Sequence, residues 1–345
     1  MNKSSIIILA FSVTLFAGGP GAEKFGTPKK LANVGNSCFM NAALQCLYNM
    51  TEFTDAILAT PPKFYKPKSI AELYKNLLKE LRETNKDVIE PIEFCPAVSK
   101  AIGQAAGTQG DVKAVVDLLF QHLLKDDLVL KDDLEVPPPA PYAPLIEYTI
   151  IIKDTYSNGN EKSRVSSPLI PNFLLSGDDF KSSFTDFTTP TDFPTPKNFD
   201  DVVIVQRISK FTKAGRYFVC TKAFGKIKPF PFPTKFDLGE YSEKSTLDYY
   251  DLISFAIHYG KSDQSGHYVA YVKKNNTWFY CSDTVVKEVK GPMIERYARR
   301  GYEESMTNLP ILLIYERQIT ESPTLKNNLL ELEQDLSALS AQIKK

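Results

Sequence analysis

The order of helical and strand patterns along the chain constrains its fold more than any other feature. Near the N-terminal end, apolar residues recur at helical spacing over residues 38–50, 69–84 and 110–125. Ser69 stands at the N-cap position of the second segment. The stretch VPPPAPYAP (136–144) cannot be helical and marks a boundary. Strand patterns follow it, so the sequence predicts an α+β fold and not alternating β-α-β units.

Beyond the boundary, two stretches between predicted strands are expected to be loops. Residues 176–199 contain SSFTDFTTPTDFPTP, show no amphipathic period and predict a long loop. Residues 260–266 begin and end with glycine and predict a flexible loop. The predicted strands are residues 148–153, 202–208, 217–221, 252–258, 267–273, 278–281 and 311–317.

The charge balance and the cysteine pattern exclude several classes of protein. The chain has 345 residues, 41 of them basic and 41 acidic, and this balance argues against nucleic acid as the main partner. No two cysteines form a C-x-x-C pair, and they are spread too widely for a disulfide framework. The pattern therefore predicts no metal site and no cofactor. The cysteines are Cys38, Cys46, Cys95, Cys220 and Cys281.

The N-terminal end has the organisation of a secretory signal peptide. Lys3 precedes the apolar run 6–16, and small residues follow up to Ala22. The run is shorter than the roughly 20 residues of a membrane span. We expect residues 1–22 to be a signal peptide and the protein to be secreted or exported; the alternative is a membrane anchor.

The C-terminal end carries a regular leucine pattern within residues 321–345. Its apolar residues are spaced 4, 3, 4, 3 and 4 apart, which predicts an amphipathic helix with one apolar seam. Such a helix either packs on its own domain or associates with a second copy or a partner, and both interpretations stay open. The seam residues are Leu325, Leu329, Leu332, Leu336, Leu339 and Ile343.

Cys38 is placed where a loop turns into a helix. The N-terminus of a helix favours a thiolate, because its free N–H groups and its dipole attract negative charge. A nucleophilic thiol also needs a histidine base. His122 lies within a helical pattern and His258 ends an apolar strand, whereas His267 follows a glycine at the start of a strand. His267 is thus the best placed of the three histidines.

The base in turn needs a third group, and the intermediate needs an oxyanion donor. Ser282 and Asp283 follow a neighbouring predicted strand; aspartate orients an imidazolium more strongly through its charge. Asn33 or Asn36 lies just before the nucleophile and could donate a side-chain amide alongside the Cys38 backbone N–H.

These segments together resemble the ubiquitin-specific proteases. LANVGNSCFMNAALQCL (31–47) is similar to the cysteine box of that family, and GHYVAY (266–271) is similar to its histidine box. Trp278 with Ser282-Asp283, and the ending PILLIYER (310–317), resemble two further boxes in the same order. The resemblance implies a papain-like domain over residues 26–318, with a helical thumb, a β palm and reduced fingers without metal.

The resemblance also implies roles for individual residues. Cys38 would be the nucleophile, His267 the base and Asn33 the oxyanion donor. Ser282 stands where the family has its third catalytic residue, with Asp283 as the fallback. The residues implied to contact the ubiquitin tail are Asp111, Gln109, Gly266 and Tyr268. Ala114 replaces a glutamate that the family uses for that tail.

The function implied is a deubiquitinase that hydrolyses peptide or isopeptide bonds after the C-terminal glycine of ubiquitin, with ubiquitin and ubiquitinated proteins as partners. The alternatives are a ubiquitin-binding scaffold without turnover and a protease for a ubiquitin-like modifier. A signal peptide on a deubiquitinase also suggests an exported effector that acts in the cytosol of a host cell.

Overall fold

The computed structural model describes residues 26–105, 108–128, 140–194, 202–223, 228–243, 248–262, 265–301 and 308–318. The expected signal peptide (1–22) and C-terminal helix (321–345) lie outside these ranges. No helix within them is long and apolar enough to cross a membrane.

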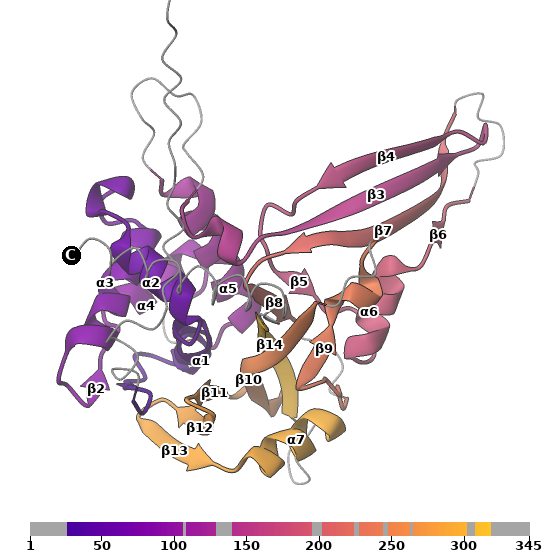
Figure 1. Ribbon diagram of the computed structural model, residues 1–345. Helices are drawn as coiled ribbons and strands as arrows, with labels where there is room; N and C mark the ends of the chain where they lie inside the picture. The colour runs from indigo at the N-terminus through magenta and orange to yellow at the C-terminus, as the bar shows by residue number, and fades with distance from the viewer. Residues whose placement is uncertain are drawn as a thin grey trace, which may run out of the picture.

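The first part of the described chain is helical, as the sequence predicts (Figure 1). Ser69 is confirmed as an N-cap, since its hydroxyl accepts a hydrogen bond from the Glu72 backbone N–H at 3.3 Å. The helices are α1 (Cys38–Tyr48), α2 (Thr51–Ala59), α3 (Ile70–Glu83), α4 (Phe94–Ala101) and α5 (Val112–Gln121), the last continuing into a π-helical turn, His122–Asp126. Strand β1 (Lys30–Leu31) precedes α1 and strand β2 (Val88–Ile89) follows α3, and the two form a short parallel pair.

Helix α1 is the centre of the fold. All eleven of its residues are buried, because it lies between the other helices and the large sheet. It contacts α2 and α5 and the strands β10 (Tyr249–Ser262), β11 (Ser265–Lys274) and β12 (Thr277–Ser282). Asn49, just after α1, donates its side-chain amide to the Ile253 carbonyl of β10 at 2.8 Å. This burial fixes the N-terminus of α1, and with it Cys38, against the sheet.

Most of the strands form one mixed sheet whose order, within the described residues, is β13-β12-β11-β10-β14-β8-β5, with β9 paired to β10. Neighbouring strands are antiparallel except β5 and β8. The strands are β5 (Phe173–Leu174), β8 (Tyr217–Thr221), β9 (Lys235–Asp237), β10 (Tyr249–Ser262), β11 (Ser265–Lys274), β12 (Thr277–Ser282), β13 (Val285–Val289) and β14 (Asn308–Arg317). Helix α7 (Gly291–Arg300) joins β13 to β14.

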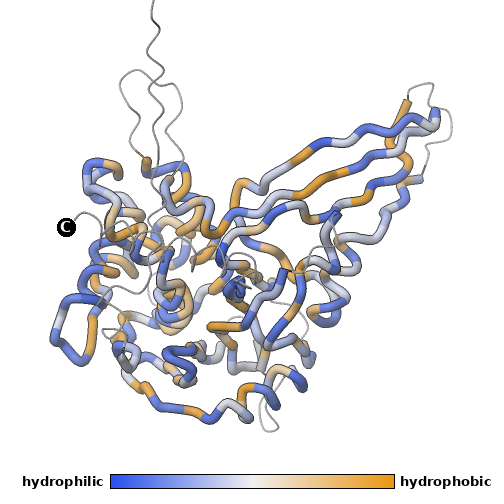
Figure 2. Tube along the Cα trace, in the orientation of Figure 1, coloured by the Kyte–Doolittle hydropathy of each residue, from blue (hydrophilic) through white to orange (hydrophobic). Residues whose placement is uncertain are grey.

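A second sheet projects away from the rest of the molecule (Figure 1). Its order is β4-β3-β7-β6, formed by β3 (Tyr148–Tyr156), β4 (Glu161–Ser166), β6 (Thr191–Asp192) and β7 (Ile204–Ala214). Apolar segments run along both the helical part and these projecting strands (Figure 2). The two sheets and the helical part together confirm the α+β class.

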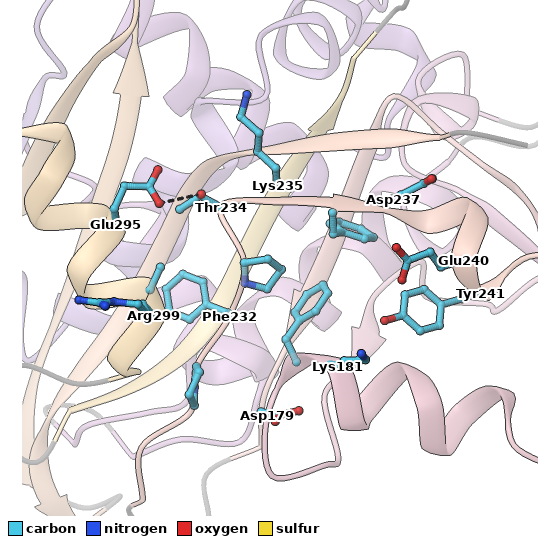
Figure 3. A pocket seen from close by; sticks show the side chains of 15 residues that line it. Asp179, Lys181, Phe232, Thr234, Lys235, Asp237, Glu240, Tyr241, Glu295 and Arg299 are labelled. Carbon is cyan, nitrogen blue, oxygen red and sulfur yellow. Dashed lines mark hydrogen bonds between the residues drawn. The ribbon is translucent and has the colours of Figure 1, made fainter.

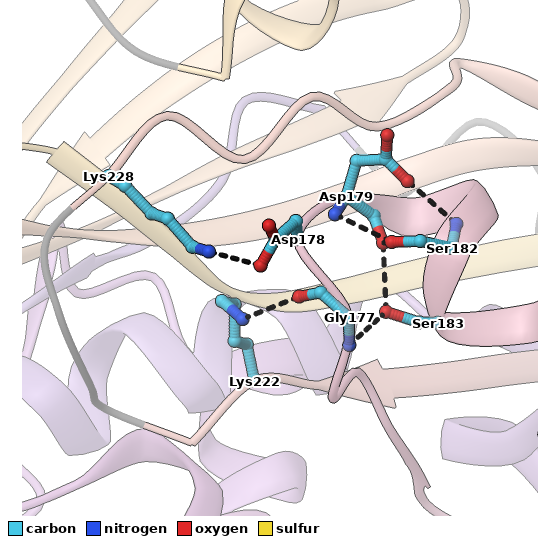
Figure 4. Close-up of polar contacts among 7 residues, drawn as sticks. All are labelled: Gly177, Asp178, Asp179, Ser182, Ser183, Lys222 and Lys228. Atoms are coloured by element: carbon cyan, nitrogen blue, oxygen red, sulfur yellow. Dashed lines mark hydrogen bonds and ion pairs between the residues drawn. The ribbon is translucent and has the colours of Figure 1, made fainter. Parts of the chain in front are cut away.

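The expectation of a long loop over residues 176–199 is wrong, because helix α6 (Phe180–Thr188) forms within it. Asp179 caps the helix: its carboxylate accepts from the Ser182 N–H at 2.6 Å, and Ser182 Oγ accepts from the Asp179 N–H at 3.0 Å (Figure 4). Phe180, Phe184 and Phe187 face one aromatic cluster, with the rings of Phe184 and Phe173 4.4 Å apart. The helical spacing of these phenylalanines was hidden among threonines and prolines.

The expected loop over residues 260–266 is largely strand. β10 continues to Ser262 and β11 begins at Ser265, with a shift of register between Tyr259 and Ser262. Gly260 allows this hairpin to close tightly, because a Cβ there would lie 2.4 Å from the Ser265 carbonyl oxygen. His267 is consequently held by a strand and not by a free loop.

Candidate active site

The turn before α1 places Cys38 at the first position of the helix. Gly35 and Asn36 both have left-handed backbone conformations, with φ of 65° and 63°. The Ser37 N–H donates to Asn33 Oδ1 at 2.9 Å, and the Val34 N–H donates to Ser37 Oγ at 2.8 Å. These bonds close the turn, so the Cys38 side chain is set at the helix N-terminus with only 5% of its surface exposed.

Strand β11 packs against helix α1, and its residue Tyr268 reaches the Cys38 thiol. The backbone N–H of Tyr268 hydrogen-bonds to that thiol, and the ring of Tyr268 lies 6.3 Å from that of Phe39. Because Tyr268 follows His267, folding brings the histidine segment to the nucleophile segment, which the sequence separates by more than 200 residues.

The surroundings of Cys38 favour the protonated thiol. Burial is the main reason why its pKa is raised, and the nearby Asp283 carboxylate raises it further. The N–H groups of Tyr268, Phe39 and Cys38 lower the pKa, but less than burial raises it. The helix N-terminus therefore favours the thiolate without overcoming desolvation.

His267 is joined to Ser282. Its Nε2 lies 2.8 Å from Ser282 Oγ, and both side chains are half-buried. The contact arises because β11 and β12 are adjacent and antiparallel, with Ala270 opposite Cys281. With Nε2 engaged by the hydroxyl, Nδ1 is the ring nitrogen left for proton transfer.

Asp283, one residue further on, points to a different part of the site. It has a left-handed φ of 49° in the turn between β12 and β13. Its carboxylate accepts from Asn33 Nδ2 and from Asn41 Nδ2, each at 2.8 Å, and its carbonyl accepts from the Leu31 N–H at 3.1 Å. Asp283 thus fixes the asparagine side of the site, whereas Ser282 contacts the histidine.

Asn41 was not anticipated from the sequence. It is 2% exposed in a helix that is otherwise almost wholly apolar, and its amide also donates to the Ala32 carbonyl at 3.0 Å. A polar side chain three residues after the nucleophile, on the buried face of a helix, was the signal that could have revealed it.

The other two histidines are structural, as the sequence suggests, although His258 borders the site through Tyr268. His258 is fully buried, with its ring 4.4 Å from that of Tyr268. His122 has its Nδ1 2.9 Å from Asp127 Oδ1, in the π-helical turn after α5.

Three of the expected tail-binding residues lie in or beside the β10–β11 hairpin that carries His267. Gln109 Nε2 lies 3.5 Å from His258 Nε2. Gly266 has φ of +153°, and a Cβ there would lie 2.4 Å from His258 Nε2, so no other residue fits without movement. Gln109, Gly266 and Tyr268 are therefore brought together around His258.

Asp111 has a structural task that the sequence did not indicate. Its side chain caps α5 by accepting from the Lys113 N–H at 2.9 Å, and burial raises its pKa. Lys113 in turn forms an ion pair with Asp117. One oxygen of Asp111 is thus used within the fold.

No cluster of histidine, cysteine, aspartate and glutamate within the described residues could hold a metal ion. All five cysteines are buried free thiols.

A buried thiol at a helix N-terminus, packed against the strand that carries a histidine in contact with a hydroxyl, is typical of the papain-like class of cysteine hydrolases. The family model described as ubiquitin carboxyl-terminal hydrolase matches residues 29–315, and the chain belongs to that family.

Curated relatives carry the same family name. The chain is 24% identical over 310 residues to "Ubiquitin carboxyl-terminal hydrolase 26" of Arabidopsis thaliana, an alignment covering 81% of this chain and 28% of that protein. It is 25% identical over 314 residues to "Ubiquitin carboxyl-terminal hydrolase 48" of Rattus norvegicus, covering 80% of this chain and 29% of that protein. A shorter match to "Ubiquitin carboxyl-terminal hydrolase 4" of Bos taurus is 33% identical over 106 residues, covering 28% of this chain and 11% of that protein. The chain spans less than a third of the length of these relatives.

Proposed function

We propose that this chain is a deubiquitinase that hydrolyses the bond after the C-terminal glycine of ubiquitin, including isopeptide bonds to lysine. The observation that carries the proposal is the 2.8 Å contact between His267 and Ser282, next to the strand residue whose N–H meets the Cys38 thiol. Family membership supplies the substrate class.

In the proposed mechanism, His267 takes the proton of Cys38 as the sulfur attacks the glycine carbonyl. Ser282 holds the imidazole through Nε2, so that Nδ1 exchanges the proton. The imidazolium then protonates the leaving amine, which departs and leaves a thioester. His267 next activates a water, which attacks the thioester, releases the ubiquitin carboxylate and returns the proton to the sulfur.

Asn33 is the proposed oxyanion donor, together with the Cys38 backbone N–H. An amide nitrogen has two hydrogens. One hydrogen of Asn33 is donated to Asp283, which aims the amide and leaves the second hydrogen for the oxyanion. In this scheme Asp283 is a positioning residue that acts through Asn33.

We assign the parts of the fold by analogy with the family. The helices α1 to α5 would form the thumb, the large sheet the palm, and the projecting sheet β4-β3-β7-β6 the fingers. The ubiquitin tail would pass by Gln109, Asp111, Gly266 and Tyr268 to reach Cys38. The lack of a side chain at Gly266 lets the backbone of β11 pack closely against His258, which fixes the hairpin beside the proposed path of the tail.

Because the pKa of Cys38 is raised, substrate binding would also have to activate the thiol. A neutral thiol reacts slowly, so the bound tail would displace water and bring Cys38 and His267 into a reactive pair.

A ubiquitin probe with an electrophile at its C-terminus tests the activity. The native chain should form a covalent adduct, Cys38→Ala should form none, and Cys220→Ala should react as the native chain does, because Cys220 is a buried thiol in β8, outside the proposed site. Binding of ubiquitin without an adduct would identify a scaffold.

Parallel probes built on ubiquitin-like modifiers test the other alternative. Ala114, which stands in place of an acidic residue, makes a tail with fewer basic side chains a serious competitor. Faster labelling by such a probe than by the ubiquitin probe would identify that modifier as the preferred substrate.

Export to a host cytosol is a separate part of the proposal, supported by the apolar run 6–16. Mass spectrometry of the mature N-terminus should find a cut near residues 19–22, and fractionation of host cells should find the protein in the cytosol. Retention of the uncut chain in a membrane fraction would favour the anchor, and confinement to an organelle lumen would contradict the export model.

A further inference from the structure

A second concave site lies on the large sheet, apart from the catalytic residues. It has a volume of about 680 Å³, is bounded by α6, β9, the 3-10 turn Leu238–Tyr241 and α7, and contains none of the proposed catalytic residues (Figure 3). Its floor is aromatic and proline-rich, formed by Phe180, Phe232, Phe236, Tyr241, Pro231 and Pro233.

Three of the acidic groups around this pocket are engaged by the fold. Glu295 accepts from the Thr234 hydroxyl at 3.0 Å, and Asp237 accepts from the Gly239 N–H at 2.8 Å. Asp179 caps α6. Hydrogen bonds hold these three carboxylates within the fold, whereas Glu240, the fourth acid among the described lining residues, is exposed and has no such contact.

Two cations at the edge of the pocket have no ion-pair partner among the described residues. Lys181 comes from the first turn of α6 and Arg299 from the last turn of α7 (Figure 3). Both are exposed, and neither forms an ion pair with the residues that the structure describes. The apolar floor is thus flanked by cations from two different elements.

The chain leaves the described fold close to this pocket. The Gln318 N–H donates to the Tyr249 carbonyl at 2.7 Å, and Tyr249 is paired with Asp237, a residue of the pocket wall. Tyr249 is also 42% exposed, which leaves an apolar ring at the exit point. The six residues 319–324 can span roughly 20 Å, enough to bring the leucine seam from this exit to the pocket.

The charges beside that seam match the rim. In heptad terms Leu329 and Leu336 occupy a positions and Leu332 a d position. Glu333 and Asp335 then fall at the flanking e and g positions, and Lys326 falls at the e position one heptad earlier. A parallel pair of such helices would place Asp335 opposite Ser340 and Asn328 opposite Glu333, so neither of these acids would meet a cation of the second copy. Glu333 and Asp335 would therefore find cations at Lys181 and Arg299 that a parallel second copy does not offer them.

We propose that residues 325–343 of the same chain dock as a helix on this pocket, with Leu332 and Leu336 on the aromatic floor and Glu333 and Asp335 beside Lys181 and Arg299. This docking is independent of the catalytic assignment.

Hydrogen exchange of the full chain, compared with a chain ending at Gln318, tests the proposal. Removal of the tail should speed exchange in the segment 230–235 and in the last turn of α7 by about tenfold. Exchange in α3, on the opposite side of α1, serves as the internal reference.

Two substitutions within the tail form a matched pair. Leu332→Asp, on the seam, should reproduce the effect of truncation, whereas Leu330→Asp, on the other face of the same helix, should not. Charge reversal at Lys181 and Arg299 to Glu should also raise exchange, and combination with Glu333→Lys and Asp335→Lys should restore protection.

Equal exchange in the full and shortened chains would overturn the proposal. So would protection that depends on protein concentration together with a dimer in light scattering, since that result would make a second copy the partner of the seam.

Discussion

The side chains of Asn33 and Asp283, 250 positions apart in the chain, are joined by a hydrogen bond of 2.8 Å. The same carboxylate accepts from Asn41, so two asparagines on either side of the nucleophile are tied to one residue of the β12–β13 turn. Ser282, its neighbour, contacts His267 instead. Two adjacent residues at the end of β12 therefore contact different parts of the site: Ser282 contacts the histidine, and Asp283 contacts the two asparagines.

The first prediction uses this division. Asn33→Ala should lower kcat by about 10²- to 10³-fold, as expected for loss of one oxyanion donor. Asp283→Ala should lower kcat through the same group, so the double variant should be little worse than Asn33→Ala alone. Steady-state hydrolysis of a ubiquitin C-terminal amide measures this coupling.

Ser282→Ala provides the comparison. Because Ser282 acts on His267 and not on Asn33, the fold-decreases in kcat for Ser282→Ala and Asn33→Ala should multiply in the double variant. Ser282→Ala should also shift the pH profile of kcat/KM, which Asn33→Ala should leave unchanged. Independent, multiplicative losses for Asn33 and Asp283 would show that Asp283 does not work through the amide.

The second prediction concerns the resting thiol. Since burial raises the Cys38 pKa above the ordinary thiol value of 9.0, alkylation of the free enzyme by iodoacetamide should keep rising through pH 9. Mass spectrometry of the peptide containing Cys38 follows the reaction. Burial also raises the pKa of Cys95 and Cys281 to about 12, so background labelling should be slow.

Asp283→Asn is the sharper version of that experiment. The negative charge of Asp283 raises the Cys38 pKa, so its removal should speed alkylation at pH 8 while turnover falls. A plateau of alkylation below pH 7 in the native chain would mean that the thiolate is already formed without substrate.

Much of this site was visible in the sequence, for identifiable reasons. The helix that begins at Cys38 and the strand that begins near His267 have strong periodic patterns, and local patterns predict local elements well. Whether Ser282 or Asp283 meets the histidine depends on the left-handed turn at Asp283 and on the β11–β12 register, neither of which sequence periodicity encodes. The capping role of Asp111 likewise needed the start of α5 to be located.

The third prediction concerns the projecting sheet, where Asp154 is fully covered and paired with Arg164 and Arg207 from the two adjacent strands. These arginines, the hydrogen bond from Arg207 above all, hold the pKa of Asp154 below its usual range. Asp154→Asn should cost on the order of 1 kcal/mol, a drop in Tm of about 2 °C near pH 7. Asp192→Asn, an exposed acid that accepts from Gln206, should change Tm much less.

The pH dependence follows from the sign of the shift. A carboxyl with a lowered pKa in the folded state stabilises fully above its unfolded pKa of about 3.9, and that contribution is lost as pH falls through the lower folded value. The difference in Tm between the native chain and Asp154→Asn should therefore be constant from pH 5 to 8 and shrink below pH 4. A difference that grows on acidification would contradict the ion-pair explanation.

The fourth prediction tests the helix that the sequence hid. Phe184 is fully buried and its ring lies within 6 Å of those of Phe173, Phe180, Phe211 and Phe218. Phe184→Ala should destabilise the domain by about 3–5 kcal/mol, because the side chain leaves a cavity among rings that cannot all move inward. Phe187, half-buried on the same helix, is the matched control, and Phe187→Ala should cost less. Urea denaturation followed by the fluorescence of Trp278 measures both. Equal and small decreases in the free energy of unfolding for the two variants would mean that α6 contributes little to the stability of the core.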